Sequence, residues 1–239
     1  VRDPSRIAEV LNRVISQAIR LSAPAQINVP RDFWTQVIDI DIPKVVSFER
    51  PSGGEEAIAQ AAKLLSEAEF PVLLNGAGVG IGGAIEATMA LAERLDAPVC
   101  CGYQHNDAFP GSHPLFAGPL GYNGSKAGME LIAKADVVLA LGTRLNPFST
   151  LPGYGIDYWP KDAKIIQVDI NPDRIGLTKP VTVGIVGDAK KVATSILGHL
   201  GSNAGEKNRT SRKAAIVQTK SAWAQELTSL THELSLIHI

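Results

Sequence analysis

The stretch from Phe70 to Gly83, FPVLLNGAGVGIGG, limits the possible folds of this chain more than any other. Residues 71–75 form a short apolar run between turn residues, which is typical of a buried strand. Five glycines follow within eight positions, and a helical pattern begins at Ala84. A strand, a glycine turn and a helix can bring backbone N–H groups and a positive helix end to an anion. A tight strand-to-helix crossover needs the same glycines for steric reasons, so the GxGxxG spacing leaves both a nucleotide site and a structural turn open.

From residue 55 onward, short apolar runs alternate with helical patterns. Strands are expected at 71–75, 97–101, 136–141, 164–170 and 181–186, and helices at 55–68, 84–95, 125–134 and 188–200. Apolar strands that are separated by helices predict an α/β fold with a doubly wound parallel sheet, covered on both faces and expected to contain six strands. Two long segments, 102–124 and 142–160, are predicted to be loops, and long loops in a compact domain are usually functional.

The remaining segments divide the chain. Residues 1–30 hold a helix that Asp3 is expected to cap and a strand expected at 25–29, and they are interpreted as the end of a preceding domain. Residues 31–52 are predicted to be a proline-bearing linker, and 53–200 to form the α/β domain. Residues 201–239 are predicted to be a second linker with a helix at 213–230, while the final LSLIHI fits no pattern. The chain has no initiator methionine, so we expect it to begin within a longer protein.

The composition excludes several classes of function. Hydrophobic residues make up 45% and charged residues 20%, which is ordinary for a soluble globular protein. A net charge of −1 favours neither nucleic acid nor an anionic membrane surface as a partner. No apolar run is long enough to span a bilayer, and the first residues have no signal-peptide pattern. The two cysteines, Cys100 and Cys101, are adjacent and predict neither a disulfide framework nor a zinc site. These features fit a cytoplasmic protein.

Ligands of an open parallel sheet bind beyond the carboxyl ends of its strands. The loops expected at that edge are 76–83, 102–124, 142–160 and 169–172. They hold most of the aromatic and polar side chains outside the predicted core: Tyr103, His105, Asn106, Asp107, Tyr122, Asn123, Arg144, Asn146, Tyr154 and Trp159. The sequence therefore predicts that any binding site of this domain lies among these loops.

Several common sites are not supported by the spacing of the polar residues. A Rossmann-type NAD site needs an acid where the second strand ends, and that strand ends in two cysteines and a glycine. Asp169 does follow a strand and either accepts a bond from a ribose hydroxyl or caps the next helix. His105 and His113 flank Asp107 in a loop, but a metal site would want a third ligand and a fixed scaffold, so histidines in water are expected here rather than a metal site. There is no GxSxG elbow and no P-loop.

Several motifs together resemble thiamine-diphosphate enzymes of the acetolactate-synthase type. PAQINVPRDFW, from Pro24 to Trp34, is similar to the end of their pyrimidine-binding domain, and the sheet from 55 to 200 resembles their central domain. The segments LGYNG (120–124), VVLALGTRLNPF (137–148), and the run from IIQVDINPDRIG to VGIVGDAKK (165–191) occur in the family's order. The resemblance covers residues 1–230. It implies that residues 1–30 end a pyrimidine-binding domain and that 201–239 lead toward a diphosphate-binding domain.

Within that family, the segments 101–128 and 146–160 look most like the acetyltransferase branch. The resemblance implies conversion of sulfoacetaldehyde and phosphate, both small molecules, to acetyl phosphate and sulfite. Acetolactate synthases carry two acids and an arginine after the arginine of this strand, and here the run is Arg144-Leu145-Asn146-Pro147-Phe148. Another carboligase or decarboxylase of the family stays open as an alternative, and so does a flavin- or nucleotide-binding module. A sirtuin-like deacetylase, an alternative from another class, would need four zinc-binding cysteines, and this sequence has only two.

The resemblance also implies the cofactors. Thiamine diphosphate and Mg²⁺ are expected to bind largely outside this chain, because the family's activating glutamate and its GDG motif do not occur in it. We therefore expect no catalytic residue and no metal ligand here, an inactive chain in isolation, and a homodimer or homotetramer for the longer protein. Flavin-binding relatives hold the nucleotide at positions matching Gly76, Ala77, Gly78, Gly121, Tyr122, Asn123, Gly124, Gly142, Arg144 and Asp169. FAD itself is not expected in the transferase branch.

Overall fold

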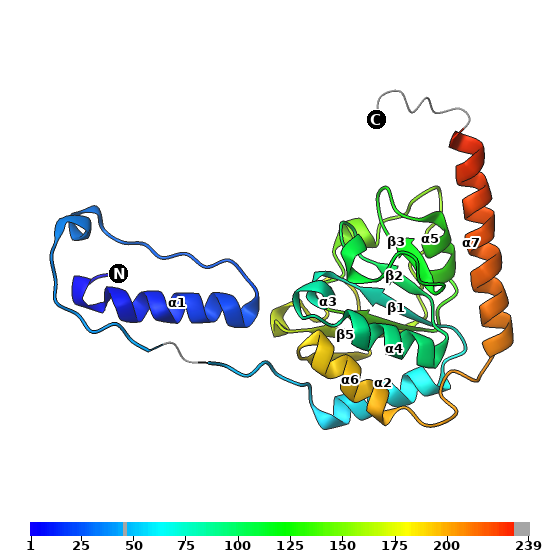
Figure 1. Cartoon of the computed structure of the whole chain (residues 1–239), viewed down its shortest axis with the longest axis horizontal. Helices are drawn as coiled ribbons and strands as arrows, with labels where there is room; N and C mark the ends of the chain where they lie inside the picture. The colour runs from blue at the N-terminus through cyan, green and yellow to red at the C-terminus, as the bar shows by residue number, and fades with distance from the viewer. Residues whose placement is uncertain (45–46, 232–239) are drawn as a thin grey trace. The chain divides into compact units, whose positions relative to one another are not determined.

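A computed structural model of the chain describes residues 1–44 and 47–231 and falls into two compact units (Figure 1). The first unit runs from Val1 to Arg50 and the second begins at Pro51. The final LSLIHI motif lies outside the described residues. Among the described residues, no helix is both long enough and apolar enough to cross a membrane.

The first unit contains one α-helix, α1 (Ile7–Leu21), preceded by the 3₁₀ turn η1 (Pro4–Arg6) and followed by η2 (Arg31–Thr35). Asp3 caps the start as predicted, because its carboxylate accepts a bond from Ser5 N at 2.9 Å. The strand predicted at 25–29 is wrong: these residues have no secondary structure. A strand exists only where a neighbouring strand pairs with its N–H and C=O groups, and no described segment does so here.

The second unit is built on one parallel sheet of six strands in the order β3-β2-β1-β4-β5-β6. The strands are β1 (Pro71–Asn75), β2 (Val99–Cys101), β3 (Phe116–Pro119), β4 (Val137–Leu141), β5 (Lys164–Asp169) and β6 (Val183–Val186). The chain order reverses direction between β1 and β4, which places the topological switch point at the ends of these two strands. The predicted α/β fold with six strands is confirmed.

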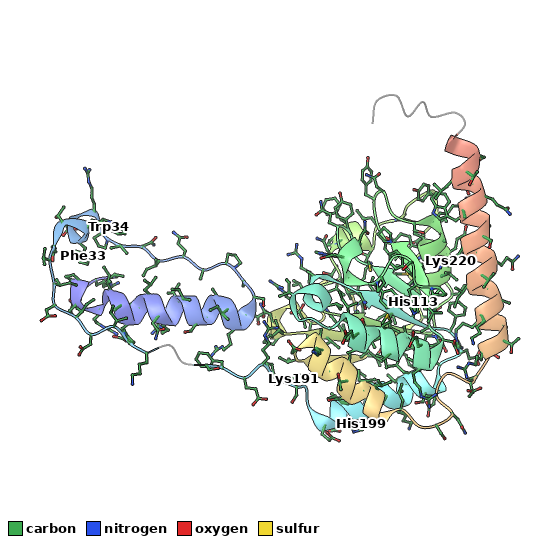
Figure 2. The ribbon with its side chains drawn as sticks, in the orientation of Figure 1. Phe33, Trp34, His113, Lys191, His199 and Lys220 are labelled. Carbon is green, nitrogen blue, oxygen red and sulfur yellow. The ribbon has the colours of Figure 1, made fainter. Side chains whose placement is uncertain are left out.

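Helices cover both faces of the sheet (Figure 1). One face packs against α2 (Glu55–Glu67), α4 (Ile85–Leu95) and α6 (Ala189–His199), and the other against α5 (Lys126–Ile132) and α7 (Arg209–Thr231). Successive side chains of a strand point to opposite faces, so each strand contributes to both hydrophobic cores. Leu73 points to the first face, and Val72 and Leu74 point to the second. Cys100 and Cys101 likewise lie in different cores. Lys220 of α7 donates to the carbonyl of Pro114 at 2.6 Å and fastens the helix beside β3 (Figure 2).

Within the second unit, three elements differ from the prediction. The sixth strand, β3, lies inside the predicted loop 102–124, where Gly118 and Pro119 hide the strand pattern. The glycine turn after β1 contains a short helix, α3 (Ala77–Ile81). The helix expected after Asn171 is only the 3₁₀ turn η5 (Pro172–Arg174), whose amide at Asp173 is capped by the Asn171 side chain. Two further 3₁₀ turns, η3 (Asn106–Ala108) and η4 (Pro147–Ser149), lie in the long loops.

Candidate functional site at the carboxyl edge of the sheet

The glycine turn after β1 is in direct backbone contact with the loop after β4. Gly76 N donates to Leu141 O, and Gly78 N donates to Gly142 O, both at 2.9 Å. A Cβ on Gly78 would lie 2.6 Å from the Cα of Gly142, closer than real Cβ contacts allow. Glycine is required here so that two backbones can meet. Two amides that could hold a diphosphate are therefore already used within the protein.

The two long loops, 102–124 and 142–160, also contact each other. Tyr103 N donates to Ser149 Oγ at 2.8 Å, and the rings of Tyr103 and Phe148 stack with centroids 5.9 Å apart. Gly121 has a φ of +94°, and a Cβ there would overlap the carbonyl oxygen of Phe148. Tyr154 donates from its hydroxyl to Gly124 O at 3.1 Å. The carboxyl edge is thus one connected surface rather than two separate loops.

Backbone strain collects at this edge. Four non-glycine residues of the two loops have positive φ: Gln104, Asn123, Leu145 and Tyr154. Gln104, Leu145 and Tyr154 each pay about 1–2 kcal/mol for the left-handed conformation, whereas asparagine adopts it more readily. Two of the other positive-φ residues, Ser22 and Asp96, only end helices, which is an ordinary use of that conformation. Strained residues persist where surrounding structure holds them and cluster at functional sites, so the two loops are the candidate site.

Several large apolar side chains are exposed on these loops, among polar residues. Tyr122, Phe148, Leu151 and Tyr154 are among the exposed large hydrophobic residues of the chain. Arg144 is exposed in the loop after β4, and its carbonyl accepts a bond from Thr178 Oγ1 at 3.2 Å. The site therefore combines exposed rings with one cation next to the switch point.

Asp169 takes part in a turn at the end of β5. It is buried, and its carboxylate accepts a bond from Asn171 N at 2.9 Å. Burial raises the pKa of Asp169, while the Asn171 amide and the charge of Arg174 act in the opposite direction. Because β4 separates β5 from β1, Asp169 stands apart from the glycine turn. The predicted site residues thus form a group around Gly76, Gly78 and Gly142, a second around 121–124, and the single Asp169.

Two buried polar side chains that the sequence analysis did not single out hold this edge together. Gln167 on β5 donates from Nε2 to Thr143 O at 3.0 Å and to Arg174 O at 3.1 Å, and its Oε1 accepts from Gly176 N. Asn75 at the end of β1 donates to Ala108 O at 2.9 Å. Gln167 lies within an otherwise apolar strand and Asn75 ends one, and a buried polar residue in such a strand is the signal that could have identified them.

The histidine, cysteine and acidic side chains of the described residues form no metal-binding cluster. No three His, Cys, Asp or Glu side chains come together within residues 1–44 and 47–231 in a way that could hold a metal ion. His105, Asp107 and His113, weighed above as possible ligands, belong to no such group, and His113 instead contacts Glu93 at 3.1 Å. A diphosphate and its Mg²⁺ thus find no such cluster of side chains among residues 1–44 and 47–231.

A family model for the central domain of thiamine pyrophosphate enzymes matches residues 58–196. The chain belongs to this central-domain family. Among solved structures, it is similar to benzoylformate decarboxylase from Polynucleobacter necessarius, with a TM-score of 0.69 and 23% identity over 86% of this chain and 39% of that one. A likeness at that identity concerns the fold alone.

Two relatives are much closer in sequence. Sulfoacetaldehyde acetyltransferase of Roseovarius nubinhibens is 80% identical over 233 residues, which are 98% of this chain and 39% of the relative. The enzyme of the same name from Rhodobacter capsulatus is 68% identical over 98% of this chain and 40% of its own length. The chain therefore spans about two fifths of the length of these relatives.

Proposed function

We propose that this chain is the central part of a thiamine-diphosphate-dependent acetyltransferase that converts sulfoacetaldehyde and phosphate to acetyl phosphate and sulfite. The observation that carries the proposal is the 80% identity to the Roseovarius nubinhibens enzyme over 98% of this chain. That match includes both carboxyl-edge loops. The cofactor supplies the carbanion chemistry when bound, and this chain contributes the central domain and its carboxyl-edge surface.

Within that enzyme, the two carboxyl-edge loops are the part of this chain that faces the substrates. The strained residues and exposed rings of these loops support this role. The glycine turn serves as a brace between β1 and β4, since Gly76 and Gly78 donate their amides to the β4 side. A nucleotide bound at this turn would have to replace the hydrogen bonds of Gly76 and Gly78. We therefore infer that the ten candidate nucleotide residues stabilise the loops or contact the substrate, and that they do not bind FAD.

The remaining properties follow from the same proposal. The longer protein uses Mg²⁺ with thiamine diphosphate, acts in the cytoplasm, and assembles as a homodimer or homotetramer. Acetolactate synthesis is the competing activity. It is disfavoured by the run Arg144 to Phe148, which offers an amide at Asn146 and no acids beyond the arginine.

A chimera tests the proposal. This chain replaces the matching 233-residue region of the Roseovarius nubinhibens relative, and the product is supplied with thiamine diphosphate, Mg²⁺, phosphate and either sulfoacetaldehyde or pyruvate. The expected result is acetyl phosphate from sulfoacetaldehyde and no acetolactate from pyruvate. Acetolactate without acetyl phosphate would move the chain to the carboligase branch. A yellow product with bound flavin would contradict the role given to the glycine turn.

A further inference from the structure

We propose that Tyr154 is a positioning residue that holds the two carboxyl-edge loops together, a role that rests on the proposed function for its catalytic consequence. The observation is a turn with an unfavourable residue in it. Ile156 N donates to Gly153 O at 2.8 Å, which closes a four-residue turn over Tyr154 and Gly155. Tyr154 has φ +52° and Gly155 has φ +73°.

Turns with two positive φ values strongly prefer asparagine, aspartate or glycine at the first central position. A tyrosine there gives up backbone stability that asparagine would keep. The side chain is 55% exposed, so burial of its ring in the core does not explain the choice. Contacts of the tyrosine side chain with residues outside the turn must therefore offset this unfavourable conformation.

The side chain of Tyr154 makes two such contacts. The hydroxyl of Tyr154 donates to Gly124 O at 3.1 Å, which connects the loop 142–160 to the loop 102–124. The ring meets the indole of Trp223 edge to face, with centroids 5.5 Å apart, which connects both loops to α7. Tyr154 thus contacts the other loop and the helix at once, in addition to the contacts that Tyr103 makes with Phe148 and Ser149.

The segment that Tyr154 holds is itself tightly wound. Gly124 N donates to Gly121 O at 2.8 Å and Ser125 N donates to Pro119 O at 2.6 Å. A Cβ on Gly124 would lie 2.6 Å from Pro119 O, so this segment has one compact conformation. The hydroxyl of Tyr154 accordingly acts on the position of residues 119–124, including the exposed Tyr122.

The test compares Tyr154→Phe and Tyr154→Asn with the parent in the full 239-residue chain. Residue-resolved amide exchange is followed at Gly124 and Ser125, and stability is followed by urea unfolding. Loss of one hydrogen bond is expected to speed exchange at both amides about fivefold in either variant. Tyr154→Asn is also expected to unfold at the same or a higher urea concentration, because asparagine suits the turn.

A control and a functional measurement complete the design. Tyr122→Phe removes a hydroxyl from the same loop that makes no hydrogen bond within the described residues, and it is expected to leave exchange at Gly124 unchanged. In the chimera, Tyr154→Phe is expected to raise the KM for sulfoacetaldehyde about fivefold with kcat changed less than about twofold.

The outcomes separate the inference from the proposed function. Unchanged exchange at Gly124 and Ser125 in both Tyr154 variants overturns the inference, and so does Tyr154→Asn that only lowers the urea midpoint. An inactive parent chimera defeats the proposed function, while the exchange experiment still decides the role of Tyr154. Faster exchange with an unchanged KM overturns the substrate-positioning role.

Discussion

Replacing Arg212 by methionine is expected to destabilise the second unit by about 3–5 kcal/mol. The side chain lies near the start of α7 and is 1% exposed. Its guanidinium donates five hydrogen bonds to backbone carbonyls, four of them at 2.7–3.1 Å. The acceptors belong to Asp96, Glu69, Lys207, Leu95 and Gly205. One side chain thus fastens the segment before α7 to the amino edge of the sheet.

The expected loss of stability follows from the backbone carbonyls that lose their hydrogen-bond donor when Arg212 is replaced. A hydrogen bond from a charged group contributes about 1.5–3 kcal/mol, and a sum over five would equal the whole stability of a typical domain. Such a sum overcounts, because Glu69 and Lys207 are exposed residues and Glu69 also lines, with Arg212, a cavity of about 350 Å³, so water can reach their carbonyls. The carbonyls of three buried residues remain, at about 1–3 kcal/mol each, and partial hydration reduces their total. Burial lowers the pKa of Arg212, yet an arginine stays charged at any pH of the assay.

Urea unfolding of the full chain, followed by circular dichroism, measures the effect without screening charges. Arg212→Lys is expected to lose about 2–3 kcal/mol, because lysine offers three donors where arginine offers five. Arg209 of the same helix is the matched control. It pairs with Asp96 and Glu206 but is partly exposed, so Arg209→Met is expected to have a clearly smaller effect. If Arg212→Met lost less than about 1 kcal/mol, or no more than Arg209→Met, the reasoning would be refuted.

Three further predictions test other parts of the account. Gly78→Ala is expected to lower stability by more than about 2 kcal/mol in thermal unfolding, whereas Gly198→Ala, in open space near the end of α6, is expected to gain about 0.4–1 kcal/mol. Both ring nitrogens of His199 contact acceptors, Ser195 O and the Glu55 carboxylate, and these raise its pKa. Protonated His199 therefore stabilises the fold below about pH 6.5, and this effect is lost as the pH rises through the pKa of the folded protein. The variant His199→Gln should lower the urea midpoint at pH 5.5 and not at pH 9. An equal effect at both pH values would contradict this. The chain alone, given thiamine diphosphate, Mg²⁺, sulfoacetaldehyde and phosphate, is expected to yield no acetyl phosphate above background.

The sheet could be predicted from the sequence because its central strands carry a local signal. Residues 137–141 are all apolar and all buried, and such a run has few alternatives to a strand covered on both faces. The edge strand β3 lacks that signal, since only two of its residues are buried and Pro119 interrupts the pattern. The helix α3 contains Gly78 and Gly80, which disfavour helix locally, and forms where the turn packs against Gly142.

The candidate site could be predicted only as a set of loops. Its contacts join residues far apart in the chain, such as Tyr103 and Ser149, and no local pattern encodes them. The same holds for Arg212, whose acceptors at Leu95 and Asp96 are more than a hundred residues away. The strand predicted at 25–29 failed for the related reason that apolar residues make a strand only beside a partner.

Sulfite release by the chimera with the Roseovarius nubinhibens relative, measured with and without phosphate, tests the central claim most directly. The account predicts that sulfite and acetyl phosphate appear in equal amounts from sulfoacetaldehyde and that both stop when phosphate is withheld. A folded chimera that binds thiamine diphosphate yet releases no sulfite under these conditions would contradict it.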